Sequence, residues 1–275
     1  MAVPGELAGL WEAHQRYGRL PWRRLVEPSI QLAQEGLATS QHMSKYLAPR
    51  SKRLKKEASM SHFFDAETGE ALKLGQLFRQ PVLADTLRLV AQHGAEVLYN
   101  GSLSDGLVAA IAGRGGIVTR RDLADYRPQW LDAVRVDLRD NLTLLTTPPP
   151  ASGLLVALAL NVLDRFKSRM TEAGAASDPL TYHRMAEAMK HAFGWRPRLG
   201  DPSSAPDASA ALVRRMTSDR LADEIAAKID DGATRTDASF YGAQEAQPED
   251  KGTSHVSVLD ADGLAVAVTS SVNDL

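Results

Sequence analysis

The sequence first suggests chemistry at a threonine that directly follows a glycine, Gly252-Thr253. A threonine hydroxyl is a poor nucleophile unless a base lies beside it. The threonine's own α-amino group can serve as that base once the preceding peptide bond is cut. An α-amino group has a pKa of about 7.7 to 8.0, which suits proton transfer near neutral pH. Cleavage between Gly252 and Thr253 would therefore create a nucleophile together with its base.

The same threonine also has an ordinary structural interpretation. Thr253 begins a segment in which polar and apolar residues alternate, and β-branched threonine is common in strands. Because Gly-Thr before a strand is not a rare pattern, the pattern alone favours a simple strand residue. We likewise interpret His255 as a histidine whose ring is satisfied by its neighbours, and we assign the carboxylates of Asp260 and Asp262 to turn formation.

The hydrophobic pattern fixes how this C-terminal segment should pair. A hairpin with a loop at 261–263 and a left-handed Gly263 places valines opposite valines, Val256 with Val268 and Val258 with Val266. A shift by one residue would place valines opposite His255 and Ser257. In the favoured register Thr253 faces Ser271 on the opposite side of the hairpin from the valines. Hydroxyls are thus expected beside the threonine.

The chain before the hairpin is predicted to be mostly helical. Apolar residues recur at helical spacing in seven segments, which have Pro, Gly, Ser, Thr or Asp at the expected ends. These segments are near 25–37, 81–92, 104–112, 119–127, 154–163, 179–193 and 218–229. Alternation of polar and apolar residues indicates a hairpin over 134–144. Pro28 is expected in the first turn of its helix. The stripe formed by Tyr182, Met185, Ala186, Met189 and Phe193 is expected in the core.

Residues 230–252, which lead to the threonine, are polar and show no period. A stretch of this kind inside a compact chain tends to be functional or disordered. Exposed segments of this type tolerate chain cleavage best.

Composition limits the remaining possibilities. The 275 residues include 32 Lys+Arg and 34 Asp+Glu, for a formal charge of -2, so we predict no nucleic-acid partner. Cysteine is absent, which excludes disulfides and a cysteine nucleophile. His183 and His191 lie eight residues apart rather than four, and we predict neither a metal site nor a cofactor. Asn100 and Asn141 begin glycosylation sequons, a weak indication of secretion.

Two features bear on the limits of the chain. The sequence contains no apolar run of about 18 residues, and Met1–Leu10 lacks the pattern of a signal peptide. It also stops at Leu275 soon after a strand of the hairpin. Because a buried strand pair normally needs further strands beside it, we expect the chain to be a fragment.

Matches to a known family extend over nearly the whole chain. The segment 252–260, followed by 267–273, resembles the processing site of the γ-glutamyltransferases, also called γ-glutamyl transpeptidases or glutathione hydrolases. Similar ordered matches occur in the residues that follow: Val3-Pro4-Gly5-Glu6, Ala13 to Trp22, Pro28 to Ala33, Tyr99 to Ser102, Gly115 to Thr119, Pro148 to Gly153 and Leu199 to Pro202. Spread over some 270 positions, they are far more specific than any single motif.

The resemblance implies an N-terminal-nucleophile hydrolase of the α/β (α+β) class with an αββα sandwich, incomplete in this chain. Residues 1–252 would be a mostly helical portion of the large subunit, and residues 253–275 the start of the small subunit with its catalytic hairpin. The proenzyme would cut itself between Gly252 and Thr253. Thr253 would then take the γ-glutamyl group of glutathione, or of a related γ-glutamyl compound, as an ester. Water, an amino acid or a dipeptide would accept that group.

The resemblance also assigns neighbouring residues. Asn273 matches a residue that holds the glutamyl group. Ser271 stands where the family often has a second threonine whose hydroxyl contacts the nucleophile. The arginine that binds the substrate α-carboxylate lies upstream of the segment matching Val3, and the oxyanion-hole glycines lie beyond Leu275. We therefore expect the 275-residue chain by itself to be inactive and poorly folded, with the rest of the small subunit as its missing partner.

Location and activity remain open to alternatives. By resemblance the protein is a glycosylated zymogen on the extracellular face of the plasma membrane, or secreted. The alternative is a non-catalytic relative, or a truncated product, with a binding or structural role.

Overall fold

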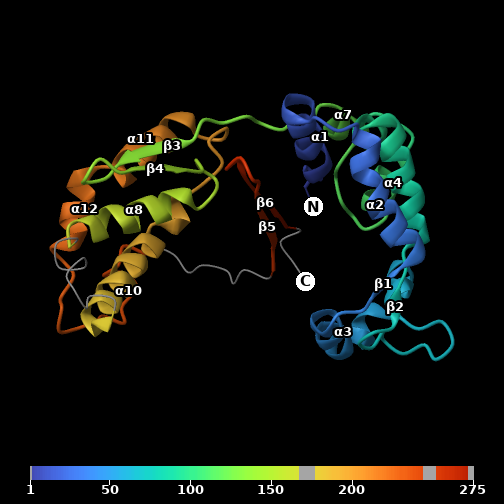
Figure 1. The fold of residues 1–275 in the computed structure, drawn as a ribbon, viewed down its shortest axis with the longest axis horizontal. Helices are drawn as coiled ribbons and strands as arrows, with labels where there is room; N and C mark the ends of the chain where they lie inside the picture. The colour runs from blue at the N-terminus through green and yellow to red at the C-terminus, as the bar shows by residue number, and fades with distance from the viewer. Residues whose placement is uncertain (1, 167–176, 244–251, 272–275) are drawn as a thin grey trace. The chain divides into compact units, whose positions relative to one another are not determined.

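The computed structural model describes residues 2–166, 177–243 and 252–271, and it divides into two compact units, 1–129 and 130–275 (Figure 1). This division follows contacts between parts of the chain. The predicted boundary at 252/253 is instead a cleavage site between two subunits, and it stays a prediction.

The first unit is mostly helical. Its helices are α1 (Glu6–Tyr17), α2 (Trp22–Glu35), α3 (Gln41–Leu54), α4 (Pro81–His93), α5 (Glu96–Tyr99), α6 (Ser104–Ala112) and α7 (Arg120–Ala124), with the 3-10 helix η1 (Ala58–Phe63) after α3. Two short strands, β1 (Leu37–Ala38) and β2 (Leu77–Phe78), pair antiparallel. They bracket the charged segment that contains α3.

The core of this unit lies between α2 and α4. Ile30 and Ala33 of α2 are buried against Ala84 and Ala91 of α4. The indole nitrogen of Trp22 donates a hydrogen bond to the carbonyl oxygen of Val90 at 3.0 Å, which ties the start of α2 to the end of α4. Small residues at the contact let the two helices approach closely.

The second unit is built around the helix α8 (Gly153–Asp164). Its other elements are the hairpin of β3 (Val134–Asp137) and β4 (Thr143–Thr146), and the helices α10 (Pro179–Gly194), η3 (Arg196–Arg198), α11 (Pro206–Met216) and α12 (Asp219–Ala226). Leu154, Leu158 and Val162 of α8 are fully buried in a cluster to which α10, α11 and α12 also contribute. The almost wholly apolar sequence of α8 thus forms a buried helix, as predicted.

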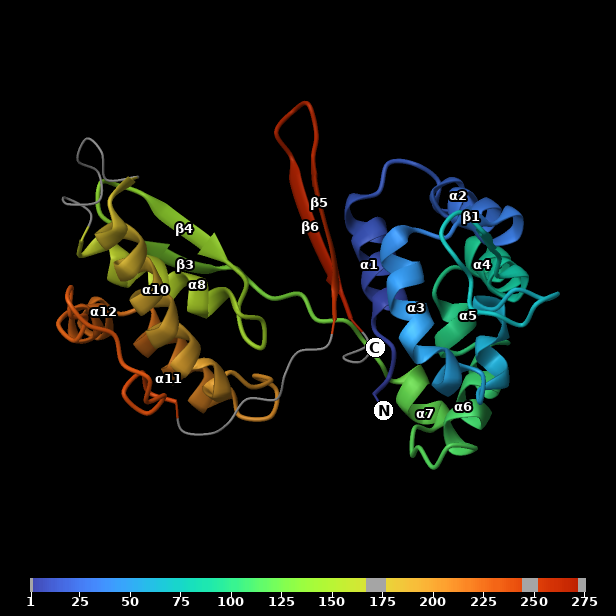
Figure 2. The same cartoon turned by 90° about the horizontal axis from the view of Figure 1, so that it is seen from below.

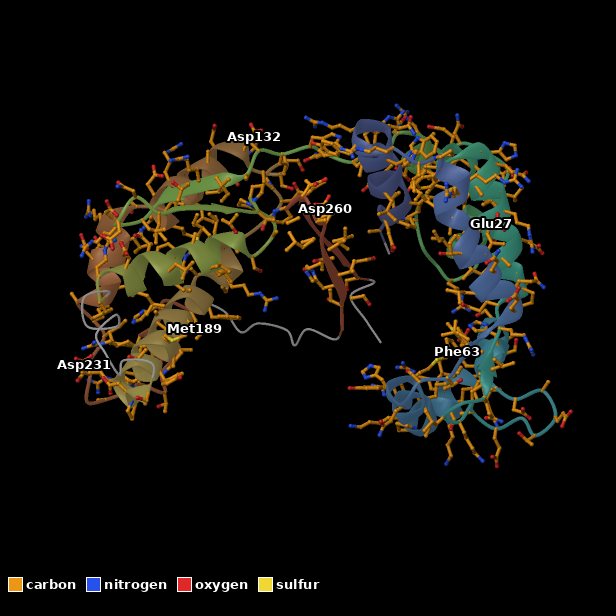
Figure 3. All side chains as sticks on the ribbon, in the orientation of Figure 1. Glu27, Phe63, Asp132, Met189, Asp231 and Asp260 are labelled. Atoms are coloured by element: carbon orange, nitrogen blue, oxygen red, sulfur yellow. The ribbon has the colours of Figure 1, made fainter. Side chains whose placement is uncertain are left out.

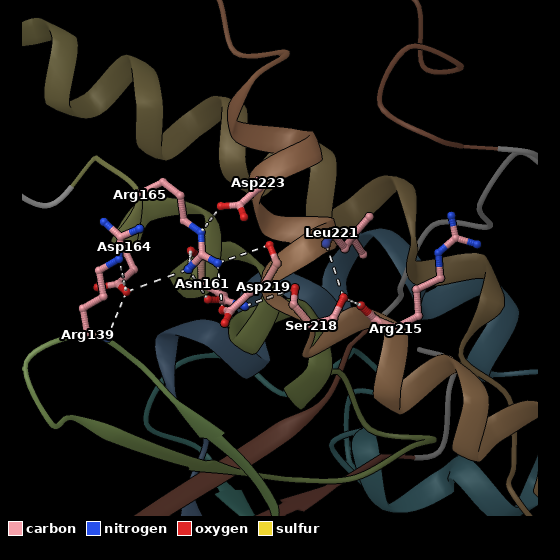
Figure 4. A network of polar contacts seen from close by, with 9 residues as sticks. All are labelled: Arg139, Asn161, Asp164, Arg165, Arg215, Ser218, Asp219, Leu221 and Asp223. Carbon is pink, nitrogen blue, oxygen red and sulfur yellow. Dashed lines mark hydrogen bonds and ion pairs between the residues drawn. The ribbon is translucent and has the colours of Figure 1, made fainter.

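Polar contacts hold the end of α8 to the start of α12 (Figure 4). Ser218 caps α12, because its side chain accepts a hydrogen bond from the backbone N–H of Leu221. Arg165, just beyond α8, reaches Asp219 at 2.7 Å and Asp223 at 2.8 Å in the first turns of α12. Carboxylates near a helix N-terminus are favourably placed in the helix dipole, and here they also bind a guanidinium that is largely buried.

Several sequence-based expectations were wrong. Helices α1, α3 and α11 were not predicted. Each of them buries a single residue, Ala8, Leu47 and Met216 respectively, so the sequence shows no long apolar stripe there. Pro28 lies in the middle of α2 rather than in its first turn. On α10 the predicted core stripe is exposed, with 59% of Tyr182, 45% of Met189 and 58% of Phe193 accessible. Met189 is labelled in Figure 3.

The exposed stripe reflects how α10 packs. Its buried face instead carries Arg184, Glu187, Ala188, His191 and Ala192. Periodicity correctly showed that one face of α10 is apolar, but the described part of the chain covers the other face.

The C-terminal hairpin consists of β5 (Ser254–Leu259) and β6 (Ala265–Ser270), which lie side by side in Figure 2. The register is the predicted one, with Val256 opposite Val268 and Val258 opposite Val266. Gly263 adopts a φ of 86°, in the left-handed region that favours glycine. The side chain of Asp260, labelled in Figure 3, accepts backbone hydrogen bonds from Asp262 and Leu264 and so closes the loop.

Candidate active site

The Gly252-Thr253 peptide bond lies immediately before β5. Both residues are exposed. Gly252 has a φ of 110°, a conformation that a residue with a side chain adopts only under strain. A glycine at this position lets the chain turn into the strand with its peptide carbonyl accessible.

Ser271 lies across the hairpin from this bond. The ladder pairs Ser254 with Ser270, so Thr253 and Ser271 are the next residues along the two strands. The hydroxyl of Ser271 donates a hydrogen bond to the carbonyl oxygen of Gly252 at 3.0 Å. The Ser271 hydroxyl thus lies at the peptide bond before Thr253, and its hydrogen-bond acceptor is the carbonyl oxygen of Gly252.

A second polar group occupies the same face of the hairpin. The ring of His255 lies between Thr269, 2.7 Å from Nδ1, and Ser257, 2.8 Å from Nε2. A neutral imidazole donates through one nitrogen and accepts through the other, so both hydroxyls can be bonded at once. His255 is therefore satisfied by its neighbours, as the sequence indicated. Alternation places Thr253, His255 and Ser257 on one side of β5.

The opposite face of the hairpin is apolar and exposed. Val256, Val258 and Val266 are each at least half accessible, and Leu264 is 63% accessible. No described residue covers this face. Asn273, predicted to hold the glutamyl group, lies outside the described residues, and its role stays a prediction.

The approach to this site is anchored on α10 through a buried carboxylate. Glu187 accepts hydrogen bonds from Tyr241 at 2.8 Å and from Thr234 at 2.6 Å, and Lys190 lies 3.0 Å from it. Burial alone would raise the pKa of Glu187, but the bonds from Thr234, Lys190 and Tyr241 outweigh it and hold the pKa below its usual value. The carboxylate is therefore ionised and fully partnered at neutral pH.

Two further contacts hold the ends of this segment. Arg184, only 2% accessible, binds Asp231 through two parallel contacts, the longer of which is 2.8 Å. Arg198 donates to the carbonyl oxygen of Gly242 at 3.0 Å. The predicted irregular stretch 230–252 is thus fixed on α10 up to residue 243, although it forms no helix or strand there.

This group of polar residues was not predicted from the sequence. Arg184, Glu187 and His191 recur at helical spacing on the face opposite the apolar stripe of α10. That pattern of buried-face polar residues could have indicated a network. Their partners in 230–243, however, follow no pattern that the sequence reveals.

The fold is that of the N-terminal-nucleophile hydrolases. The γ-glutamyltranspeptidase of Helicobacter pylori superposes with a TM-score of 0.74 at 28% identity, over 86% of this chain and 66% of that one. A γ-glutamyltranspeptidase from Pseudomonas nitroreducens, solved with L-DON, gives 0.71 at 29% identity, over 85% of this chain and 67% of that one.

The chain belongs to the γ-glutamyltranspeptidase family, whose sequence profile matches residues 1–275. Glutathione hydrolase 2 of Arabidopsis thaliana is 36% identical over 273 residues, or 99% of this chain and 46% of that protein. The mouse glutathione hydrolase 5 proenzyme is 40% identical over 274 residues, or 99% of this chain and 48% of that protein. The chain thus spans about half the length of these relatives. Among the described residues, no helix is long and apolar enough to cross a membrane.

Replacement of Tyr241 by Phe should loosen the anchored segment. The hydroxyl of Tyr241 donates to Glu187 and accepts the backbone N–H of Arg235 at 3.0 Å. Its loss leaves a buried carboxylate short of a donor, which costs about 1–3 kcal/mol. Hydrogen exchange should then accelerate roughly tenfold or more at residues 230–243.

Tyr46→Phe on α3 is the matched control, because no described residue bonds to the Tyr46 hydroxyl. Its exchange rates over 230–243 should equal those of the wild type. Equal rates in Tyr241→Phe as well would contradict the anchoring role.

His191 should make the second unit sensitive to acid. Its Nε2 is buried without a hydrogen-bond partner among the described residues. Burial, with smaller contributions from Lys228 and Lys190 that Glu187 partly opposes, lowers the pKa of His191 to about 4. Between the unfolded value near 6.5 and about 4 the unfolded state binds more protons, so stability falls as pH falls through this window.

Urea unfolding at pH 7 and pH 4.5 measures the effect. We expect His191→Phe to abolish roughly 1–2 kcal/mol of the wild-type loss of stability between these pH values. An identical pH dependence in the two proteins would show that His191 is not the titrating group.

Proposed function

We propose that the full-length protein transfers γ-glutamyl groups from glutathione and related γ-glutamyl amides to water, amino acids or peptides. Support comes from membership of the γ-glutamyltranspeptidase family and from relatives named glutathione hydrolase. The observation that carries the proposal is the exposed Gly252-Thr253 bond at the entrance to β5, with a hydroxyl bonded to its carbonyl.

In this proposal Thr253 acts twice. Its hydroxyl first attacks the peptide carbonyl of Gly252, and the later cut leaves Thr253 with a free α-amino group. An α-amino group ordinarily has a pKa of about 7.7 to 8.0, so near neutral pH such an amine can accept the proton of the Thr253 hydroxyl. The hydroxyl then attacks the γ-carbonyl of the substrate, the amine leaving group departs with a proton, and a γ-glutamyl ester forms. Water or an acceptor amine releases the product.

Surrounding residues support this chemistry indirectly. Ser271 and Asn273 are proposed to contact the nucleophile and the glutamyl group. Eight residues separate the anchored segment 230–243 from Gly252, so the anchored segment lies on the large-subunit side of the proposed cut. The remaining substrate contacts and the oxyanion hole are proposed to come from parts of the protein outside these 275 residues.

Thr253→Ala in the full-length protein should abolish both processing and turnover. Without the hydroxyl, neither attack can occur, and γ-glutamyl release should fall by at least about 1000-fold. Intact-mass measurement should show a new N-terminus at Thr253 in the wild type and an uncut chain in the variant.

Thr86→Ala on α4 is the control, because among the described residues that hydroxyl bonds only to the Val82 carbonyl of its own helix. It should leave cleavage and release unchanged. The 275-residue chain expressed alone should release no γ-glutamyl product. An uncut wild-type protein without γ-glutamyl release would instead favour the non-catalytic alternative.

We further propose that the protein is glycosylated and acts outside the cell or on its surface. Asn100, at the end of α5, and Asn141, in the β3–β4 turn, are both exposed and so sterically open to modification. Treatment of the protein from its native source with an N-glycosidase should lower its mass and convert modified asparagine to aspartate. Unchanged mass at both sites would reject glycosylation.

A further inference from the structure

We propose that Ser271 is the oxyanion donor of the self-cleavage reaction at Gly252-Thr253, an inference that rests on the proposed function. Its hydroxyl donates a 3.0 Å hydrogen bond to the carbonyl oxygen of the bond to be cut. This role differs from contact with the nucleophile, because it acts during self-cleavage, before substrate turnover begins.

The register of the hairpin determines that Ser271 forms this hydrogen bond. Six consecutive residue pairs join β5 to β6, from Ser254 with Ser270 to Leu259 with Ala265. Ser271 directly follows that ladder, as Gly252 and Thr253 directly precede it. The left-handed Gly252, with a φ of 110°, directs its carbonyl to the Ser271 side chain. A change in register by one residue would place Ser271 on the other face.

Charge develops on the carbonyl oxygen as the reaction proceeds. The Thr253 hydroxyl attacks the carbonyl carbon of Gly252, and the C=O π electrons move onto oxygen to give a tetrahedral oxyanion. A hydrogen bond to an anion is about twice as strong as one to a neutral carbonyl. The Ser271 bond therefore strengthens in the transition state, which is the condition for an interaction to accelerate a reaction.

The complete reaction needs only water besides the chain. Collapse of the oxyanion breaks the bond between the Gly252 carbonyl carbon and the Thr253 nitrogen, and that nitrogen takes up the proton lost by the Thr253 hydroxyl. The product is an ester between Gly252 and the Thr253 Oγ1. Water hydrolyses it to a Gly252 carboxyl group and the free hydroxyl, leaving Thr253 with its α-amino group.

Other hydroxyls on this face have partners of their own. Ser257 and Thr269 are both bonded to His255, and the backbone holds them further along the hairpin. Ser271 is the side chain that the described structure bonds to the Gly252 carbonyl. Once the bond is cut, that carbonyl belongs to a separate chain end. In the proposed sequence the Ser271 hydroxyl then contacts Thr253, so one side chain serves two steps in succession.

The test is the rate of self-cleavage of full-length protein, followed by mass spectrometry from synthesis onward. Ser271→Ala should slow cleavage by about 10- to 100-fold, somewhat less than the loss of a donor from an enclosed oxyanion hole. Ser271→Thr keeps the hydroxyl and should stay within about threefold of the wild type. Ser270→Ala is the matched control: the same residue type, one position earlier, on the opposite face, with an expected rate equal to wild type.

Hydroxylamine separates the two chemical steps. Because it attacks esters, it accelerates cleavage only when ester hydrolysis limits the rate. We expect no acceleration in Ser271→Ala, since the attack on Gly252 is then limiting. Restoration of the wild-type rate by hydroxylamine would overturn the proposal, as would an unchanged rate in Ser271→Ala.

The two proposals fail in different ways. If the wild-type protein is cut at Thr253 and Ser271→Ala is cut equally fast, the proposed function stands and only the role of Ser271 is rejected. A wild-type protein that is never cut removes both. A slow Ser271→Ala whose rate Ser271→Thr does not restore would show a structural effect and would overturn the donor role.

Discussion

The alternation of side chains along two paired strands is the constraint on which the site depends. The valine pairs of β5 and β6 allow one register, because a slip by one residue would exchange the apolar and polar faces. That register carries Ser271 to the Gly252 carbonyl. The residues that set the packing of the hairpin thus also determine where the Ser271 hydroxyl lies.

A buried carboxylate positions the chain on the N-terminal side of the proposed cleavage site. Glu187 gathers Thr234, Lys190 and Tyr241, and Arg184 binds Asp231, so the irregular segment 230–243 is ordered by charge and hydrogen bonding. A buried ion is tolerated only when its partners replace the lost water. Once the chain is cut, these contacts would keep the large-subunit end attached to α10 up to residue 243.

Sequence predicted the elements with strong local signals. The capping box of Thr119 and Asp122, the Ser218 cap and the buried α8 all follow from local pattern. The hairpin register and the proximity of Ser271 to the Gly252-Thr253 bond were also predictable. Helices α3 and α11 were not, because each buries a single residue, Leu47 and Met216, and so gives little apolar periodicity in the sequence. The Glu187 network brings together residues some fifty positions apart, and no local pattern reports such pairings.

The unpaired edges of the C-terminal hairpin have a practical consequence. Among the described residues β5 and β6 pair only with each other, so each strand has one edge that no other described strand joins, beside a face of exposed valines. Such an edge is a template for pairing with another copy of the chain. A polypeptide in which no further strand covers these edges would therefore be inclined to form insoluble aggregates, and its recovery would depend on chaperones or on co-expression with a strand donor.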